Sequence, residues 1–260
     1  MVAKKHFYVE ESRVNLSNEI VIGRYSVLPF YAELERDLSL QGSRLINSQR
    51  QHLYIANFDY YEDLKDIVIG INSNGSSVYL TPKSWFDLRD IPQDGAFVVK
   101  CRTNSRKSQW NEKMFAPNKK KAVEIALDLQ LDPMIGDQGI VVREYVPLKA
   151  SEIGINGQPF ANEWRFFFYK KTCISFGYYW STADSIPHNS EIPEEGKAIA
   201  QKAADILADN VNFFVVDVAE TQNGDWIVIE VNDGQMSGLS ENEPEILYSN
   251  LAAAIKSSED

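Results

Sequence analysis

The sequence contains few of the residues on which several common kinds of functional site depend. Among its 260 residues there are two cysteines and three histidines. Cys101 and Cys173 are too few for a disulfide framework, and no histidine or further cysteine lies at metal-ligand spacing from them. We therefore expect no zinc site. The chain also lacks the Ser–His or Cys–His pattern of an enzyme with an activated nucleophile.

Long apolar runs and an excess of positive charge are also missing. No apolar stretch reaches the roughly 20 residues that span a bilayer, and no signal-peptide core follows the basic N-terminal residues. The formal net charge of −11 opposes broad binding to nucleic acid. With 44% hydrophobic and 24% charged residues, the composition predicts a cytoplasmic globular protein with no membrane partner and a ligand that is small or proteinaceous.

The most informative segment that is present is an acidic hairpin in the C-terminal part of the chain. Two apolar strands are predicted on either side of Asn223–Gly224, a pair typical of a two-residue turn. With that turn, Asp217 lies directly opposite Glu230, and Asn232 points to the same face two residues later. The sequence therefore predicts that three oxygen-bearing side chains converge.

Two opposed carboxylates favour a metal ion. Their Cβ atoms would lie about 5 Å apart, and at an effective dielectric of about 20 their repulsion is roughly 3 kcal/mol. A divalent cation replaces this repulsion with attraction, and two carboxylates with an amide suit Mg²⁺. The alternative is a surface hairpin with solvated acids. It is disfavoured by the apolar opposite face that the predicted register gives, formed by Phe214, Val216, Val218, Ile227, Ile229 and Val231.

Periodicity and turn residues predict an α/β (α+β) chain of three units, over residues 1–94, 95–146 and 147–260. The first unit begins as a βαβ motif, and Thr81–Pro82 is typical of a helix start. Strands are predicted over 19–23, 44–47, 66–70, 96–101, 139–146, 163–169, 173–180, 213–220 and 226–232. Helices are predicted over 28–38, 83–88, 118–130, 193–208 and 244–255.

Two lysines in the second unit are candidate phosphate ligands. Lys100 follows an apolar strand, and Lys107 lies in the polar loop over residues 102–108. Taken alone, a strand-end lysine is more often a solvated surface residue. The loop contains no glycine, so side-chain donors would have to replace backbone amides there, and Arg106 is an alternative to Lys107.

The order of these features resembles the ATP-grasp superfamily over about residues 95–240: Lys100 at a strand end, Lys107 in a loop, Glu144–Tyr145–Val146 after an apolar strand, then the acidic hairpin. Asn162–Phe168 followed by Phe214–Val218 is similar to the branch that contains phage and bacterial proteins of unassigned substrate and a eukaryotic translation-initiation-factor assembly protein. The resemblance implies an ATP-grasp fold with an N-terminal α/β unit, a small subdomain and a C-terminal subdomain, the last two sandwiching the nucleotide.

The resemblance also implies ATP and Mg²⁺ as cofactors and gives each residue a role. Lys100 would contact the α-phosphate and adenine, and Lys107 the β- and γ-phosphates. Main-chain groups of Glu144 and Val146 would read the edge of adenine, with Tyr145 packed between them.

The remaining implied roles concern the transferred phosphoryl group, the metal and the ribose. Arg165 would stabilise the transferred phosphoryl group, although a strand ion pair is a competing interpretation. Asp217, Glu230 and Asn232 would bind Mg²⁺. Lys149 and Glu152 are candidates for the ribose hydroxyls.

The implied function is an ATP-dependent ligase that forms an amide or peptide bond through an acyl phosphate. Its partner would be a small molecule, peptide or protein that bears a carboxylate. The alternative is an ATP-binding assembly or interaction factor with little turnover. Near predicted strand ends of the first unit, Arg24, Tyr25 and Arg44 are candidates for holding the carboxylate, with surface placement as the competing interpretation.

Overall fold

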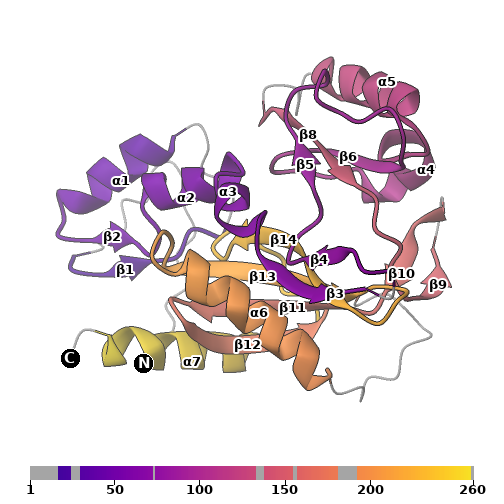
Figure 1. Ribbon diagram of the computed structural model, residues 1–260. Helices are drawn as coiled ribbons and strands as arrows, with labels where there is room; N and C mark the ends of the chain where they lie inside the picture. Colours follow the sequence, from indigo (N-terminus) through magenta and orange to yellow (C-terminus); the bar gives the residue numbers. More distant parts are fainter. Residues whose placement is uncertain are drawn as a thin grey trace.

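The computed structural model describes residues 17–24, 30–72, 74–132, 138–154, 157–180 and 192–258. Figure 1 shows the arrangement of the elements. The N-terminal part forms β1 (Ile20–Val21), α1 (Tyr31–Ser39), β2 (Arg44–Leu45), α2 (Gln49–Ala56), α3 (Tyr60–Leu64), β3 (Val68–Ile71), β4 (Ser77–Tyr79) and β5 (Ser84–Trp85). The middle part forms β6 (Phe97–Cys101), the 3₁₀ helix η1 (Lys107–Gln109), α4 (Trp110–Lys113), β7 (Phe115–Ala116), α5 (Lys119–Gln130) and β8 (Ile140–Glu144). The C-terminal part forms β9 (Ala150–Ile153), β10 (Pro159–Ala161), β11 (Glu163–Tyr169), β12 (Thr172–Tyr178), α6 (Glu194–Leu207), β13 (Phe213–Glu220), β14 (Trp226–Asp233) and α7 (Pro244–Ser257).

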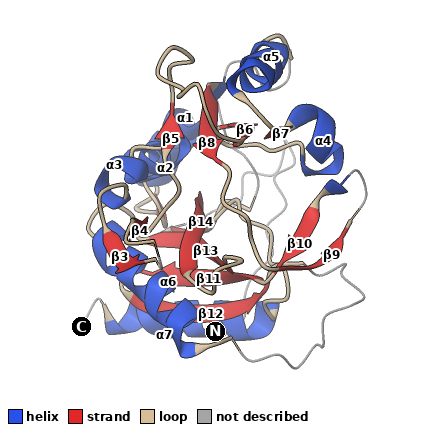
Figure 2. Cartoon of the chain, turned by 45° about the vertical axis from the view of Figure 1, so that its right-hand side comes forward, coloured by secondary structure: helices blue, strands red, loops and turns tan. Residues whose placement is uncertain are grey.

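Four short strands form a small antiparallel sheet in the order β5-β8-β6-β7. Helix α5 packs on it, since Ile125 shares a buried cluster with Val99 and Val142. Asn118 caps the start of this helix, where its side chain accepts from the amide of Lys121. Figure 2 shows the small sheet and α5 above the larger sheet.

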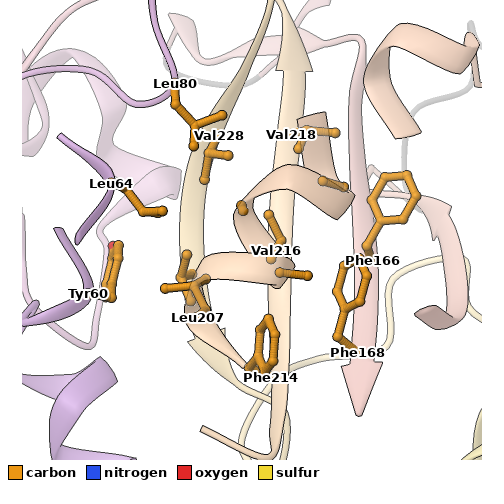
Figure 3. Close-up of a cluster of buried hydrophobic side chains, with 14 of the residues drawn as sticks. Tyr60, Leu64, Leu80, Phe166, Phe168, Leu207, Phe214, Val216, Val218 and Val228 are labelled. Atoms are coloured by element: carbon orange, nitrogen blue, oxygen red, sulfur yellow. The ribbon is translucent and has the colours of Figure 1, made fainter. Parts of the chain in front are cut away.

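Four longer strands form the large antiparallel sheet, in the order β12-β11-β13-β14. One face packs on α6, where Phe214, Val216 and Leu207 share the buried cluster drawn in Figure 3. The other face packs on α7, where Phe213 contacts the cluster that contains Leu251. Because helices cover both faces, β13 is a continuous apolar run rather than an alternating one, apart from its single buried acid.

The N-terminal residues form the expected βαβ start. Strands β1 and β2 are parallel and connected through α1. The first two residues of the predicted helix over 28–38, and Tyr25, lie outside the described residues. No helix among the described residues has the length and apolar character needed to cross a membrane.

The prediction of a helix after Thr81–Pro82 is wrong. The segment forms β5, which pairs antiparallel with β8. The hydroxyl of Thr81 does not cap a helix but accepts a hydrogen bond from Arg143 Nη2 at 2.8 Å. The carbonyl of Lys83 accepts from the amide of Glu144, just after the paired residues of β8, and the amide of Ser84 donates to the hydroxyl of Tyr61, so tertiary contacts override the local helix-start signal.

The acidic hairpin has the predicted pairing at its centre but a different turn. Asp217 lies opposite Glu230. The turn holds three residues rather than two, because the amide of Thr221 donates to the carbonyl of Asp225 at 2.8 Å. Next to the turn the pairing is therefore displaced by one residue, and a bulge at Ile229 restores the predicted pairing beyond it.

This bulge also changes which side chains of β14 face the core. Val228 and Val231 both join the cluster under α6, because the bulged residue between them resets the alternation. The expectation that Ile227 and Ile229 lie on that face is wrong. Beyond the bulge, Asn232 pairs with Val215 and shares the face of the two acids, as expected.

A buried polar cluster ties the N-terminal elements to the end of β14. The carboxylate of Asp233 accepts from Asn47 Nδ2 and from the amide of Gln235, both at 2.9 Å. It also lies 2.9 Å from Nδ1 of His52, a second buried side chain. The strand end that follows the acidic pair is therefore fixed by α2 and by the residues just before it.

Candidate functional site

A charged seam joins the small sheet to the large sheet. Lys100 on β6 donates through Nζ to Oε1 of Glu230 on β14. Arg143 on β8 donates through Nη1 to the carbonyl of Ile229, also on β14. Both cations are buried. The site predicted from sequence therefore lies where the small sheet meets β14, and we call this group of charged contacts the seam.

Asp217 is fully buried in the seam, with an exposed fraction of 0%. Arg165 lies directly across from it on β11. Two parallel hydrogen bonds join them, from Nε to Oδ1 at 2.9 Å and from Nη2 to Oδ2 at 2.8 Å. A bidentate pair of this kind is among the stronger polar interactions in proteins. The competing interpretation of Arg165, a cross-strand ion pair, is thus present, and its role toward phosphate stays a prediction.

The repulsion expected between the two acids is relieved within the protein. Asp217 has the guanidinium of Arg165 as its partner, and Glu230 has the ammonium of Lys100. Side chains thus supply the compensating charge that we expected from a metal ion. A metal ion that binds here has to displace a cation from each carboxylate.

Lys100 is not the solvated strand-end residue that its sequence context favours. It is 7% exposed, and its Nζ lies 5.6 Å from the ring centroid of Phe58. Burial, the guanidinium of Arg143 and the ammonium of Lys107 lower the pKa of Lys100 to about 7. An ammonium in such surroundings is stabilised by an added anion, which a phosphate group would supply.

Lys107, at the start of η1, reaches the residues that follow β12. Its Nζ donates to the hydroxyl of Tyr179 and lies 4.0 Å from the centroid of that ring. Burial lowers the pKa of Lys107, but the nearby Glu163 and Tyr179 outweigh this effect and raise it. Lys107 therefore stays charged beside the seam.

Arg106, the alternative to Lys107, is directed elsewhere. Its Nη2 donates to Oδ2 of Asp132 at the end of α5. This ion pair keeps Arg106 near the end of α5, which packs on the small sheet. Lys107 instead contacts Tyr179, next to β12 of the large sheet. The geometry favours Lys107 as the loop cation.

Glu163 adds a third carboxylate near the seam. It is 4% exposed and lies two residues before Arg165 on β11. Burial and the negative charge of Asp217 raise the pKa of Glu163 to about 7, against the opposing effect of Lys107 and Arg165. The site therefore contains a carboxyl group that changes its charge near neutral pH.

The predicted adenine-reading segment follows β8. The amide of Glu144 donates to the carbonyl of Lys83, away from β6, whereas the amide of Tyr145 donates to the carbonyl of Ala96, beside β6. In a strand the amide and carbonyl of one residue point to the same side, so the carbonyl of Glu144 also points away from β6. Its use by adenine, together with the amide of Val146, stays a prediction.

The two predicted ribose ligands lie beyond this segment. Lys149 forms an ion pair with Glu220 at 2.9 Å, and its side chain is 62% exposed. Glu152 lies on β9 opposite Phe160 of β10. Neither contact belongs to the seam, and their role stays a prediction.

The comparison with known protein families decides the classification. The model of a family of ATP-grasp domains, the third family of its clade, matches residues 88–251. The match covers more than half of the chain. This chain belongs to that ATP-grasp family. No curated protein matches this member of the family.

Several solved structures are similar to this ATP-grasp chain at low sequence identity. D-cycloserine synthetase DcsG is 15% identical with a TM-score of 0.51, over 95% of this chain and 87% of that one. D-alanine–D-alanine ligase from Bacillus anthracis is 15% identical with a TM-score of 0.49, over 88% and 70%. A RimK domain ATP-grasp protein from Sphaerobacter thermophilus is 14% identical with a TM-score of 0.48, over 82% and 72%. The predicted ATP-grasp fold is confirmed.

The acidic hairpin of this ATP-grasp chain offers oxygen ligands that fit a hard divalent cation. Asp217, Glu230 and Asn232 share one face of adjacent strands. Within the described ranges, no cluster of three or more His, Cys, Asp or Glu side chains is arranged to hold a metal ion. Two carboxylates and an amide suit Mg²⁺, which keeps several waters and binds substrate phosphates. The metal assignment stays a prediction.

Two seam residues were not identified from the sequence. Arg143 is buried and bridges Thr81, Ser84 and β14. The available signal is an arginine inside an apolar strand, which needs buried acceptors. Tyr179 follows β12, and nothing in the sequence indicates that its hydroxyl accepts a hydrogen bond from a loop lysine 72 residues away.

Proposed function

We propose that this protein is an ATP- and Mg²⁺-dependent ligase that joins a carboxylate to an amine. The supporting observation is the seam, in which three cations from different elements lie close to the buried carboxylate of Asp217 and the partly buried carboxylate of Glu230 on adjacent strands. These cations are Lys100, Lys107 and Arg165. Their positive charges complement the negative charge of a triphosphate. The carboxylate oxygens are suitable ligands for a hard metal ion.

Each residue has a role in this proposal. Lys100 and Lys107 bind the nucleotide phosphates, and main-chain groups of Glu144 and Val146 read adenine. The acidic hairpin holds Mg²⁺ through Asp217, Glu230 and Asn232, and the ion when bound neutralises phosphate charge. Lys149 and Glu152 bind the ribose, and Arg165, released from its carboxylate partner, stabilises the transferred phosphoryl group.

The proposed reaction proceeds through an acyl phosphate. A carboxylate oxygen of the substrate attacks the γ-phosphorus of ATP, and the bond from that phosphorus to the β,γ-bridging oxygen breaks, so ADP leaves. The amine nitrogen then attacks the acyl carbon, phosphate leaves with the bonding electrons, and the nitrogen loses a proton. Both steps need positioning and charge neutralisation more than a strong protein base, in keeping with the cation-rich seam.

The test is incubation with ATP, Mg²⁺, a pool of amino acids, peptides or other carboxylates, and hydroxylamine. Hydroxylamine captures an acyl phosphate as a hydroxamate even when the natural amine is missing. We expect ADP and phosphate, but not AMP, in step with hydroxamate detected by mass spectrometry. Arg165→Lys keeps the charge but not the bidentate geometry and should lower the hydroxamate yield. Formation of AMP and pyrophosphate would exclude this reaction.

The second candidate is an ATP-binding assembly or interaction factor, as in the eukaryotic relatives of the branch that the sequence resembles. The observation in its favour is that Lys100 and Arg165 are both engaged by carboxylates, while the covering loop has no glycine to bring backbone amides to the phosphates. Tight ATP binding without turnover in any pool, together with a protein that co-purifies only with the ATP-loaded form, would favour this candidate over the ligase.

A further inference from the structure

A groove of about 760 Å³ runs along the outer edge of β12. Strand β12 and strand β14 are the two edges of the large sheet, so the groove lies at the edge opposite to the Lys100–Glu230 pair. Residues of α6 and α7 also line it, and Figure 1 shows these two helices beside β12. Its lining includes Phe176 and Ser175 of β12, Lys197 of α6, and Ile246 and Asn250 of α7.

The backbone of β12 presents hydrogen-bonding groups to this groove. The amide of Tyr179 donates to the carbonyl of Glu163 in β11, so alternation along the ladder turns the backbone groups of Phe176 and Tyr178 away from β11. The outward carbonyl of Tyr178 already accepts from the amide of Glu241 at 3.1 Å.

The outward groups of Phe176 are those left for a ligand. Farther along the strand, Asn250 of α7 donates to the carbonyl of Ile174 at 2.8 Å. Both neighbouring outward carbonyls thus have protein partners, one on each side of Phe176. No bond from another described residue fills the outward amide and carbonyl of Phe176 itself. The available edge is therefore short and centred on this residue.

The side chains at this edge combine apolar surface with negative charge. Phe176 is 45% exposed and Ile246 is 56% exposed, although both are large and apolar. Around them the groove is lined by the carboxylates of Glu194, Glu241 and Glu243 and by one cation, Lys197, which pairs with Glu194 at 2.7 Å, so the lining keeps a negative net charge. An occupant that fits combines apolar side chains with positive charge.

We propose that this groove binds a short extended peptide segment with alternating basic and apolar residues, which adds to the large sheet as a strand beside β12. Main-chain hydrogen bonds to Phe176 give the segment its position, and the flanking helices contact its alternate side chains. A second copy of this chain fits less well. Its groove has the same acidic lining, and its own α6 and α7 flank β12 on both sides.

The experiment uses the full chain and the capped peptide acetyl-(Lys-Val)₃-amide. We expect a saturable calorimetric binding signal and slower hydrogen exchange at the amide of Phe176. Two further peptides carry backbone N-methyl groups. In one of them the lysines are methylated, and in the other the valines. Because alternate amides of an extended peptide point to one edge, at least one methylated peptide should bind about tenfold more weakly.

Protein variants locate the binding and leave the proposed active site intact. Ile246→Glu changes a half-exposed helix residue and should weaken binding of the peptide by removing apolar contact. Glu241→Lys should weaken it through charge. Leu131→Glu is the matched control, since Leu131 is 83% exposed at the end of α5, outside the groove. Binding should also be unchanged by Glu230→Gln and by the absence of ATP, so it can fail or succeed independently of the ligase proposal.

Four outcomes would overturn the proposal. The first is that acetyl-(Lys-Val)₃-amide does not bind, and the second is that it binds equally to wild type, Ile246→Glu and Glu241→Lys. The third is that neither backbone-methylated peptide binds more weakly than the parent peptide. The fourth is that the purified protein forms a concentration-dependent dimer that Ile246→Glu dissociates, which would assign the groove to a second copy of the chain.

Discussion

At the scale of single residues, the seam is governed by charges that lie out of water. Removing one partner from a buried ion pair leaves the other charge without compensation. Arg165 has a side chain that is 8% exposed, and its carboxylate partner is fully buried. We therefore expect Asp217→Asn to lower the free energy of unfolding of the nucleotide-free protein by about 3 to 5 kcal/mol, measured by urea denaturation.

The matched control is Asp87→Asn. Asp87 also pairs with an arginine, Arg89, but that side chain is 88% exposed. Exposed pairs contribute about 0 to 1 kcal/mol, so this variant should unfold close to wild type. If both variants lost equally little stability, the charge of Arg165 would not depend on Asp217, and the proposed exchange of partners in the seam would lose its basis.

Glu163 provides a prediction about pH. Burial is the main reason why its pKa is raised to about 7, whereas the group ionises near 4.3 in an unfolded chain. Between these values the folded state binds more protons than the unfolded state, so the free energy of unfolding falls as pH rises from about 4.3 to 7. We expect Glu163→Gln to remove up to about 3 kcal/mol of this fall.

The measurement is urea denaturation of wild type and Glu163→Gln at several pH values from 5 to 8. The difference between the two proteins isolates this carboxyl from the other groups that titrate in the interval. A difference that stays constant over the whole interval would mean that Glu163 ionises alike in both states.

At the scale of elements, the hairpin of β13 and β14 joins the acidic pair to the small sheet. Deleting Ile229 should leave a regular ladder that still places Asp217 opposite Glu230, because the bulge contributes one unpaired residue. It removes the carbonyl that accepts from Arg143. We expect a folded protein whose free energy of unfolding is lower by about 1.5 to 3 kcal/mol, the contribution of a hydrogen bond to a charged group.

A one-residue insertion in the turn serves as the control for this deletion. Glycine placed between Asn223 and Gly224 lengthens an exposed loop and should leave stability and the seam unchanged. Circular dichroism checks folding in both variants. If the insertion destabilised the protein more than the deletion did, the turn rather than the bulge would fix the position of the acids.

Elements with strong local signals could be predicted from the sequence. The strand Glu163–Tyr169 and the helices near Asn118 and Pro244 have apolar patterns and end residues that agree with their tertiary contacts. Strand β5 could not be predicted, because its partner lies in β8, nearly 60 residues later. Helix α2 was not predicted, although Ser48 and Gln51 form a capping box at its start. Half of its residues are polar, so its sequence has no clear apolar periodicity. The boundaries at 94/95 and 146/147 stay predictions.

The candidate site shows the same division. Asp217 and Glu230 could be placed opposite each other because both lie within one hairpin, where register follows from a short connection. The pairing was correct although the turn and the bulge were not anticipated, since the two displacements cancel. The partners of these acids could not be derived, because Lys100 and Arg165 reach them from other strands.

At the scale of the whole molecule, the seam is a set of contacts that nucleotide and metal would exchange. Lys100 and Arg143 reach from the small sheet to β14, and Lys107 reaches from the loop to Tyr179. The nucleotide phosphates would pair with the cations, and Mg²⁺ would bind the carboxylates that the cations release. Neither exchange is favourable alone, because each leaves buried charges of one sign without partners. Binding of ATP and Mg²⁺ should therefore be strongly coupled.

This coupling is measurable by calorimetric titration of ATP with Mg²⁺ and with a chelator. For wild type we expect Mg²⁺ to raise the affinity for ATP at least about tenfold, since coupling free energies between sites commonly reach 1 to 3 kcal/mol. In Glu230→Gln the carboxylate no longer holds Lys100, so ATP should bind better than to wild type without metal, and the gain from Mg²⁺ should shrink. Lys100→Met should weaken ATP binding about tenfold to a hundredfold in Mg²⁺, the contribution of one charged hydrogen bond. Equal affinities for ATP in all three proteins, with and without Mg²⁺, would show that the seam does not bind the nucleotide.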